Sequence, residues 1–348
     1  MFALTSFLAK RALPALLILA ATGCLFRPPA ERLLDDYLGR LSRVLDQPRP
    51  ELERGTPPRM PRPRELQQTI EPLSVGVLDY WGFRECGLAE ILGERNSVLG
   101  RVMVPSQHLH MDGRLLIQLD YCQRELEDEE LLELAADLAE KKSEQWPARY
   151  WNATLAAPEM RRFWSTSTEP LTPDTTVGYR ESEAALNYLS NLPDRLEAEQ
   201  WPSLSDLEGQ YQHLDGDKLG GKLLQSLQLA RDYLEAANDM LAEARREAAL
   251  CPRGLQQPEL EYARNVMVKV FVGEVQPWLA SVDQRTGAIL TAYNQLAEKQ
   301  PESLSASLND YRRAVNQLHT DFQQTTREHV DQWQQLFESC DSEAIESD

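Results

Sequence analysis

A regular apolar seam in the C-terminal half of the chain constrains the fold more than any other feature. Its positions are Leu223, Leu227, Ala230, Leu234, Ala237, Leu241, Ala244 and Ala248. The steps between them alternate between four and three residues, which keeps the apolar side chains on one face of an α-helix. The seam therefore predicts a long helix that packs lengthwise in a coiled-coil-like bundle.

Two further long helices follow this seam. Pro252 is expected to end the first helix, and the pattern predicts a second over 258–298, with a kink at Pro277. A third helix is predicted over 304–337. Because the connecting turns are short, neighbouring helices should be antiparallel, so residues 177–348 are predicted to form a long-helix bundle.

Shorter helices are expected in residues 65–176, so the predicted fold class is all-α throughout. The clearest periodic segments are 86–94, 109–125 and 129–142. Pro147 and Pro158 punctuate the aromatic-rich segment 146–164, and the polar stretch 165–176 is predicted to be a loop between the two halves.

The N-terminus has the pattern of a bacterial signal peptide. Lys10 and Arg11 precede an apolar run over 12–21, which is too short to cross a bilayer as a helix. The run ends in small residues directly before Cys24, and this resembles the lipobox of bacterial lipoproteins. We therefore expect residues 1–23 to be cleaved and Cys24 to carry the lipid. Ordinary cleavage beside a coincidental cysteine, or an uncleaved anchor, are the alternatives.

The residue after the expected lipidation site suggests where the anchor lies. Leu25 stands where an Asp would typically retain a lipoprotein in the inner membrane. By resemblance to that sorting rule, we expect an outer-membrane lipoprotein whose body faces the periplasm.

Four cysteines remain, and in an oxidising compartment an even number suggests two disulfides. The bundle places the ends of the first and third long helices together, which predicts a Cys251–Cys340 pair and leaves Cys86 to pair with Cys122. None of the spacings gives a Cys-x-x-Cys pair, so no zinc site is expected.

Residues 24–64 are expected to hold the anchor, a short helix over 30–47 and a Pro/Arg-rich arm. The segment 27–64 contains nine Arg, no Lys and six acidic residues. Proline disfavours regular helix, so this stretch is either a linker or an arm wrapped on the body. Its positive charge could contact anionic lipid, although a solvated linker is the simpler interpretation.

The overall charge of −19 argues against nucleic acid as a partner, because phosphate binding needs clustered Lys and Arg. We find no pattern typical of a serine hydrolase, a zinc protease or a bound cofactor, so no catalytic residue, cofactor or metal is expected. The segment from Gly216 to Lys222 matches the spacing of a phosphate loop, but Leu223 replaces the magnesium-binding hydroxyl. A glycine-softened helix start capped by Asp217 explains it better.

The histidines and neighbouring acids also favour structural roles. His213, Asp215 and Asp217 alternate in a predicted loop and could bind a cation weakly, although loop polarity is the simpler interpretation. His319 and His329 lie ten residues apart on one helix, where a structural role or a solvated face is expected.

Two polar segments, 94–107 and 146–164, look least like simple packing. They combine Arg with Trp, Tyr and amide side chains, a mixture that can form a recognition patch. The candidate ligand or partner residues in them are Arg95, Asn96, Arg101, Gln107, Arg149, Trp151 and Asn152. A structural network that fixes this half explains the same residues equally well.

Several short motifs resemble an uncharacterised family of bacterial envelope lipoproteins, domain of unknown function 3080. They are the lipobox, Cys86-Gly-Leu, the run from Glu94 to Met103, Pro105-Ser-Gln, the run from Pro147 to Leu155, Asn265-Val and the run from Val275 to Leu279. The resemblance covers nearly the whole mature chain and implies no activity, cofactor or catalytic residue.

Together these patterns predict a non-enzymatic helical module, held at the membrane through Cys24. It would bind another envelope protein or a cell-wall component, or support the envelope. One alternative is a small-ligand binding protein that uses segments 94–107 and 146–164. A hydrolase acting on the cell wall or lipid is less favoured, because no nucleophile, base or metal cluster is evident.

Overall fold

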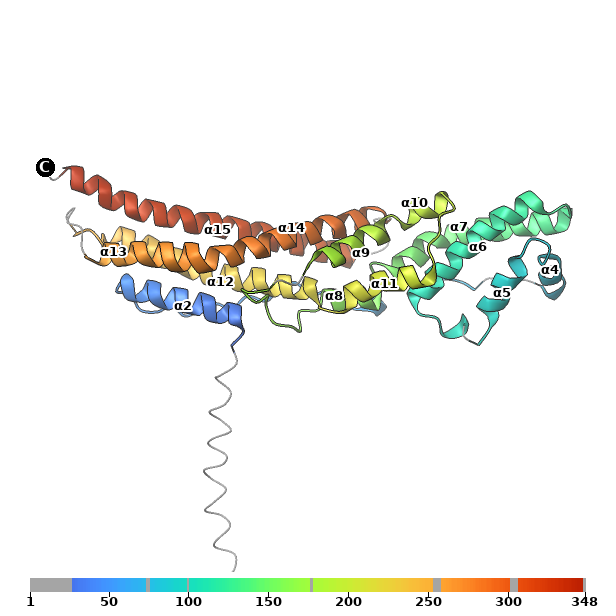
Figure 1. Cartoon of the computed structure of the whole chain (residues 1–348), viewed down its shortest axis with the longest axis horizontal. Coiled ribbons are helices and arrows are strands. Elements are labelled where there is room, and N and C mark those ends of the chain that lie inside the picture. Colours follow the sequence, from blue (N-terminus) through green and yellow to red (C-terminus); the bar gives the residue numbers. More distant parts are fainter. Residues whose placement is uncertain are drawn as a thin grey trace, which may run out of the picture.

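The computed structural model describes residues 27–72, 76–98, 100–175, 178–252, 258–300 and 306–346. Over these ranges the chain forms helices and turns and has no β-strand, which confirms the predicted all-α class. The helices make an elongated body, with the C-terminus at one end and α4 and α5 at the other (Figure 1). In the ranges described, no helix combines the length and apolar character needed to span a bilayer.

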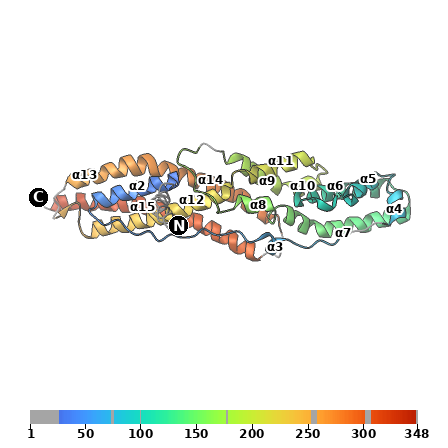
Figure 2. The same cartoon turned by 90° about the horizontal axis from the view of Figure 1, so that it is seen from below.

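Long helices form the half of the body that contains the C-terminus. They are α2 (Pro29–Val44), α12 (Leu219–Arg246), α13 (Pro258–Asn265), the π-helical η4 (Val266–Val275), α14 (Gln276–Glu298) and α15 (Ala306–Glu346). Helices α12 and α15 run along each other (Figures 1 and 2). The predicted seam is buried from Leu223 to Ala244. Its last predicted position, Ala248, is wrong, because α12 ends at Arg246 and Ala248 lies half-exposed beyond it.

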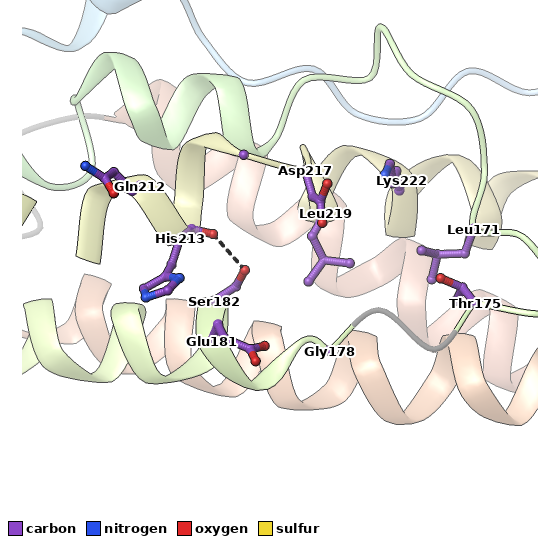
Figure 3. Close-up of a pocket in the computed structure, with 11 residues that line it drawn as sticks. Leu171, Thr175, Gly178, Glu181, Ser182, Gln212, His213, Asp217, Leu219 and Lys222 are labelled. Carbon is purple, nitrogen blue, oxygen red and sulfur yellow. Dashed lines mark hydrogen bonds between the residues drawn. The ribbon is translucent and has the colours of Figure 1, made fainter. Parts of the chain in front are cut away.

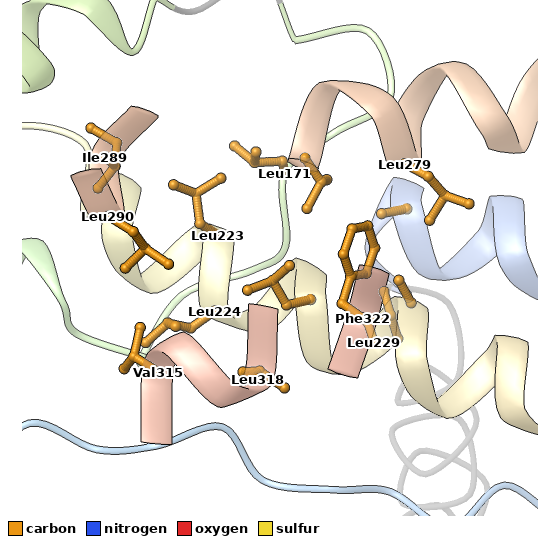
Figure 4. Packing of buried hydrophobic residues seen from close by; sticks show 14 of the residues in the cluster. Leu171, Leu223, Leu224, Leu229, Leu279, Ile289, Leu290, Val315, Leu318 and Phe322 are labelled. Carbon is orange, nitrogen blue, oxygen red and sulfur yellow. The ribbon is translucent and has the colours of Figure 1, made fainter. Parts of the chain in front are cut away.

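The core of this bundle is continuous across its helices. Residues drawn from it include Leu223, Leu224 and Leu229 of α12, Leu279, Ile289 and Leu290 of α14, and Val315, Leu318 and Phe322 of α15 (Figure 4). Leu171, from the loop before α9, packs into the same cluster. Burying this much apolar surface is the main force that holds the long helices together.

The predicted second helix is present from Pro258 to Glu298, but its winding changes along the way. Pro277 has no N–H to donate, and in α-helical geometry its ring would press on the carbonyl four residues earlier. The ten residues of η4, just before α14, are π-helical. Wider π-turns are one way for a helix to accommodate such an interruption, and the chain continues into α14 without a break.

A second hydrophobic cluster fills the other end of the body. It lies among α4 (Val77–Gly82), α5 (Leu88–Asn96), α6 (Pro105–Glu125) and α7 (Glu129–Ala153). Helices α6 and α7 also reach the first core, because Leu109 and Tyr150 are buried there while Leu119 and Leu138 are buried in the second cluster. This helical hairpin therefore connects the two cores.

Both predicted disulfides are present with the predicted pairing. Cys86 joins Cys122 in the second cluster, and Cys251 joins Cys340 where α12 and α15 end together. All four cysteines are buried. Disulfides persist in oxidising compartments, so this pairing indicates an extracytoplasmic body.

Helix α7 is longer than the sequence predicted. Its predicted end at Lys142 is wrong, because the helix continues through Pro147 to Ala153. Tyr150 and Trp151 of this last part are buried in the first core, and their burial offsets the lost backbone hydrogen bond. Pro158, by contrast, starts the short helix α8 (Pro158–Phe163) in the first-turn position that suits proline.

Short helices that the sequence analysis did not resolve lie between the two ends. They are α9 (Arg180–Ser190), α10 (Leu192–Glu197) and α11 (Leu204–Asp215). Residues 165–175 form the predicted loop between α8 and α9. The predicted boundary at residue 176 stays a prediction. The first core contains residues from both sides of it.

The Pro/Arg-rich segment is an arm wrapped on the body rather than a free linker. Its backbone N–H at Gly55 donates to Asp232 of α12 at 3.1 Å, and Arg54 donates to Glu31 of α2 at 2.8 Å. Arg49 forms an ion pair with Asp35 of α2. The arm then contains α3 (Pro63–Leu66) as it passes toward α7 (Figure 2).

Candidate functional site

The most unusual polar arrangement in the structure surrounds one buried carboxylate, that of Asp112 in the middle of α6. Lys142 of α7 donates to it at 3.0 Å, and Arg149, two turns further along α7, donates to it at 2.7 Å. Arg95, at the end of α5, approaches the other carboxylate oxygen to 3.6 Å. Three cations from two helices thus meet one anion from a third; we call these four residues the Asp112 cluster.

The sequence places two of these charged groups on buried helix faces. Asp112 follows Leu109 on the inner face of α6, and Lys142 follows Leu138 on that of α7. The side chains of Asp112 and Lys142 are only 4% and 1% exposed. The side chains of Arg149 and Arg95 keep 12% and 17% exposure, so the cluster meets solvent on their side.

The charges perturb one another strongly. Burial raises the pKa of Asp112, but the nearby cations, Arg149 foremost, outweigh burial and hold that pKa below its usual value. Burial lowers the pKa of Lys142 to about 8, with Arg95 and Arg149 adding to the effect and Asp112 opposing it. The pKa of the half-buried His108 is also lowered, first by burial and then by Arg149. Positive charge is therefore in excess here.

Only part of the predicted ligand set converges on this cluster. Arg95 and Arg149, predicted from separate segments, meet at Asp112. Asp112 and Lys142 were not predicted, although a charged residue inside an otherwise apolar helical stripe is a signal that identifies such positions. The side chain of Arg101 lies outside what the structure describes, as does Cys24.

Other predicted ligand residues have structural contacts. The Trp151 indole N–H donates to the carbonyl of Leu66 at 2.6 Å. The Asn152 side chain accepts from the backbone N–H of Gln68 at 2.8 Å and donates to its carbonyl at 2.7 Å. These bonds hold the arm onto α7, so the structural network that was the alternative explanation accounts for them.

The remaining two predicted residues lie at helix ends. Gln107 accepts from the backbone N–H of Val104 at 3.2 Å and so caps the start of α6. Asn96 is exposed at the last position of α5. Neither residue contacts Asp112 among the interactions of the described residues.

A cavity of about 400 Å³ lies elsewhere, between the loop before α9, α9 itself, α11 and the start of α12. Figure 3 shows His213, Asp217 and Lys222 around it, with the Ser182 hydroxyl donating to the carbonyl of His213 at 3.1 Å. Asp215 turns away to pair with Arg162, so the alternating acids do not converge. In the described parts of the chain, no three His, Cys, Asp or Glu side chains are placed to hold a metal.

The glycines beside this cavity serve packing. A Cβ at Gly221 would collide with the carbonyl of Ser165, and one at Gly220 would collide with Phe163 and Trp164. The predicted cap by Asp217 is wrong, because the N-cap residue of α12 is Lys218, which has a left-handed conformation with φ of 49° and makes no side-chain capping hydrogen bond. The segment from Gly216 to Lys222 follows helix α11, whereas a phosphate loop follows a strand.

The closest approach to a catalytic arrangement is a His–Asp pair between α15 and α14. His319 lies 2.7 Å from a carboxylate oxygen of Asp283, and Gln323 donates to the same oxygen at 2.8 Å. Among the described residues, no Ser, Thr or Cys side chain hydrogen-bonds to His319. The pair therefore lacks the nucleophile that a hydrolytic triad needs.

The other helix α15 histidine, His329, is fully buried. It lies 2.5 Å from the Tyr37 hydroxyl of α2 and 2.6 Å from the Asn238 side-chain oxygen of α12. The Trp333 indole N–H donates to the same hydroxyl at 3.0 Å. This network joins three helices in the first core, which confirms the structural role expected for His329.

Comparison with known proteins identifies a family and nothing closer. A family model described as a protein of unknown function, DUF3080, matches residues 34–344. No curated protein matches the chain, and no solved structure does either. The family description names no activity and no ligand, so function has to be argued from the residues.

Proposed function

The chain belongs to the DUF3080 family, and we propose that it is an extracytoplasmic lipoprotein whose helical body binds another component of the envelope. A lipid on Cys24 would hold this body at the periplasmic face of the outer membrane. The observation that carries the proposal is the pairing of the other four cysteines with one another. This pairing leaves no other cysteine of the chain for Cys24, which directly follows the small residues that a lipoprotein signal requires.

The expected lipidation site lies close to a helix that is fixed to the body. The first described helix, α2, is fixed to the body by the His329 network. Arg27, just before this helix, forms an ion pair at 3.0 Å with Asp35 inside it. The link from Cys24 to this fixed point is therefore only a few residues long. A lipid at Cys24 would hold the body close to the membrane surface, since several acyl chains together give firm binding.

Binding is favoured over catalysis by the way the polar groups are used. The strongest buried network, around His329, is satisfied within the bundle, and the His319–Asp283 pair has no nucleophile among its contacts. A disulfide also joins the ends of α12 and α15, which restrains the long helices relative to one another. Such a body is suited to presenting a fixed surface to an envelope protein or a cell-wall component.

Metabolic labelling tests the anchor. Cells that express the full chain are fed an alkyne-tagged palmitate, and the protein is then recovered and its label measured. We expect Cys24→Ser to abolish the label and to leave an uncleaved precursor of higher mass. Cys24→Ser that still carries label would disprove lipidation at this residue.

The sorting part of the proposal is tested by membrane fractionation. We expect Leu25→Asp to move the protein from the outer-membrane to the inner-membrane fraction, with Leu25→Gln as a control that is polar but uncharged. Equal distribution of the two variants would refute outer-membrane sorting through this position.

In-cell crosslinking of the wild type and of Cys24→Ser tests whether binding of an envelope partner depends on the anchor. No crosslinked species in the wild type would contradict the binding role.

A further inference from the structure

The Asp112 cluster contains more positive charge than its own carboxylate can balance. With Lys142, Arg95 and Arg149 charged, the cluster carries one anion and three cations. The nearest neighbouring acid in the sequence, Glu94, pairs with Arg114 at 2.8 Å. Uncompensated charge is costly to bury, so a surplus of this kind favours the uptake of an external anion.

The unused donors of the cluster face the solvent side. Arg149 reaches Asp112 through its Nε, which leaves the two terminal amino groups of its guanidinium without an acceptor among the described contacts. Arg95 approaches Asp112 only to 3.6 Å, too long for a hydrogen bond, and no hydrogen bond from its guanidinium occurs among those contacts. Both arginine side chains keep partial exposure, whereas the side chains of Asp112 and Lys142 are almost fully buried.

We propose that the Asp112 cluster is a binding site for a small oxyanion, either a carboxylate or a phosphate group, held by the guanidinium groups of Arg95 and Arg149. Planar guanidinium groups present paired donors that match the oxygen spacing of both anions. Asp112 would fix the direction of Arg149, and the Lys142 charge beneath would strengthen the positive field. The ligand would lie on the solvent side of the two arginines rather than in a closed cavity.

The site does not depend on the anchor proposed above, because every residue in it lies within the described body. Its position on α5, α6 and α7 puts it in the half of the molecule away from the C-terminus (Figure 1). A bound oxyanion there would link α5 to the α6–α7 hairpin. A ligand that carries such a group would thus be recognised on rigid helices, which favours precise binding.

Titration calorimetry on the purified full chain in detergent tests the proposal at constant ionic strength and pH 7. The probes are inorganic phosphate, an acetylated tripeptide with a free C-terminal carboxylate, and the same tripeptide with an amidated C-terminus. We expect saturable binding of phosphate or of the free-carboxylate peptide, and none of the amidated peptide. Which of the two binds identifies the source of the oxyanion. No saturable binding of either would overturn the proposal.

Charge-matched variants separate a built site from general attraction. Arg95→Gln is expected to weaken binding at least tenfold. Arg114→Gln, which removes an equal charge from α6 at a residue that pairs with Glu94, is expected to weaken it by less than twofold. Equal losses in the two variants would overturn the site.

A purely structural role for Arg95 is tested through the free protein. Because Asp112 keeps Arg149 and Lys142, Arg95→Gln should leave the thermal unfolding midpoint of the unliganded protein unchanged. If the midpoint falls, Arg95→Lys decides between the two roles. A variant that restores the midpoint but still binds the oxyanion at least tenfold more weakly than the wild type supports the site. Any other result with Arg95→Lys means that Arg95 is structural and refutes the proposal.

Discussion

Acidification should destabilise this protein through one buried side chain, His329. Its Nδ1 lies 2.6 Å from the Asn238 side-chain oxygen, and its Nε2 lies 2.5 Å from the Tyr37 hydroxyl. Asn238 also donates its amide to the Thr325 carbonyl, which leaves the Asn238 oxygen as the acceptor. The ring must therefore donate through Nδ1 and accept from Tyr37 through Nε2, which is possible only for neutral imidazole. Burial accordingly lowers the pKa of His329 to about 3.

The size of the effect follows from the difference between folded and unfolded states. An unfolded histidine has a pKa of about 6.5, so between pH 6.5 and pH 3 the unfolded chain binds a proton that the folded chain does not. Stability must then fall as the pH falls through this window. Between pH 7.5 and pH 5.0, a single group with these pKa values removes about 2 kcal/mol from the free energy of unfolding.

Urea unfolding at pH 7.5 and pH 5.0 measures this loss directly, for the wild type and for His329→Gln. Glutamine can accept from Tyr37 and donate to Asn238 but does not titrate in this range. The pKa values of His108 and His110 are also lowered by burial, so part of the acid loss comes from them in both proteins. We expect the wild type to lose about 2 kcal/mol more than the variant on acidification. Equal losses in the two proteins would refute the argument.

Two further predictions test other parts of the structure. The free energy of unfolding should rise by about 2–3 kcal/mol from pH 8 to pH 10.5, because the pKa of Lys142 is lowered to about 8 in the folded chain and the unfolded chain keeps its proton over this range. Lys142→Met should remove this rise in urea unfolding measured across that range. A rise that persists in the variant would contradict the prediction. Gly221→Ala should lower the free energy of unfolding by about 1–3 kcal/mol, because the added Cβ collides with Ser165. Gly209→Ala, in the open middle of α11, should raise it by about 0.5–1 kcal/mol. Thermal unfolding measures both variants, and similar midpoints for the two would exclude the close approach at Gly221.

The features that sequence predicted best depend on local spacing. The alternating seam from Leu223 fixed which face of α12 is buried, because helical periodicity alone decides this. The pairing of Cys251 with Cys340 followed from the antiparallel order of three helices joined by short turns. Neither prediction required knowledge of how the N-terminal half packs.

The predictions that failed depended on contacts between distant segments. A helix was predicted only as far as Lys142, before Pro147, but the burial of Tyr150 and Trp151 against the first core keeps α7 helical through that proline. The cap expected from Asp217 was replaced by the turn at Lys218, which lets α12 begin close against the loop after α8. Local propensity does not contain these tertiary contacts.

The candidate site shows the same division. Its two arginines could be selected from composition, since Arg95 occurs in a polar segment with amide side chains and Arg149 in one rich in aromatic residues. Their meeting could not, because it requires α5 to pack across the α6–α7 hairpin and Asp112 to lie between them. The indole N–H of Trp151 donates to the carbonyl of Leu66, so this predicted ligand residue holds the arm on α7 instead.

Two buried polar networks in this protein therefore lead to opposite conclusions from one physical rule. A buried polar group that has all its partners stabilises one arrangement of the chain, and the donors and acceptors around His329 are matched one to one. A buried group with surplus charge keeps a cost that an external ligand can remove, and the Asp112 cluster has three cations for one carboxylate. The first network explains why α2 stays on the bundle. The second is the place where this fold has most to gain from a partner.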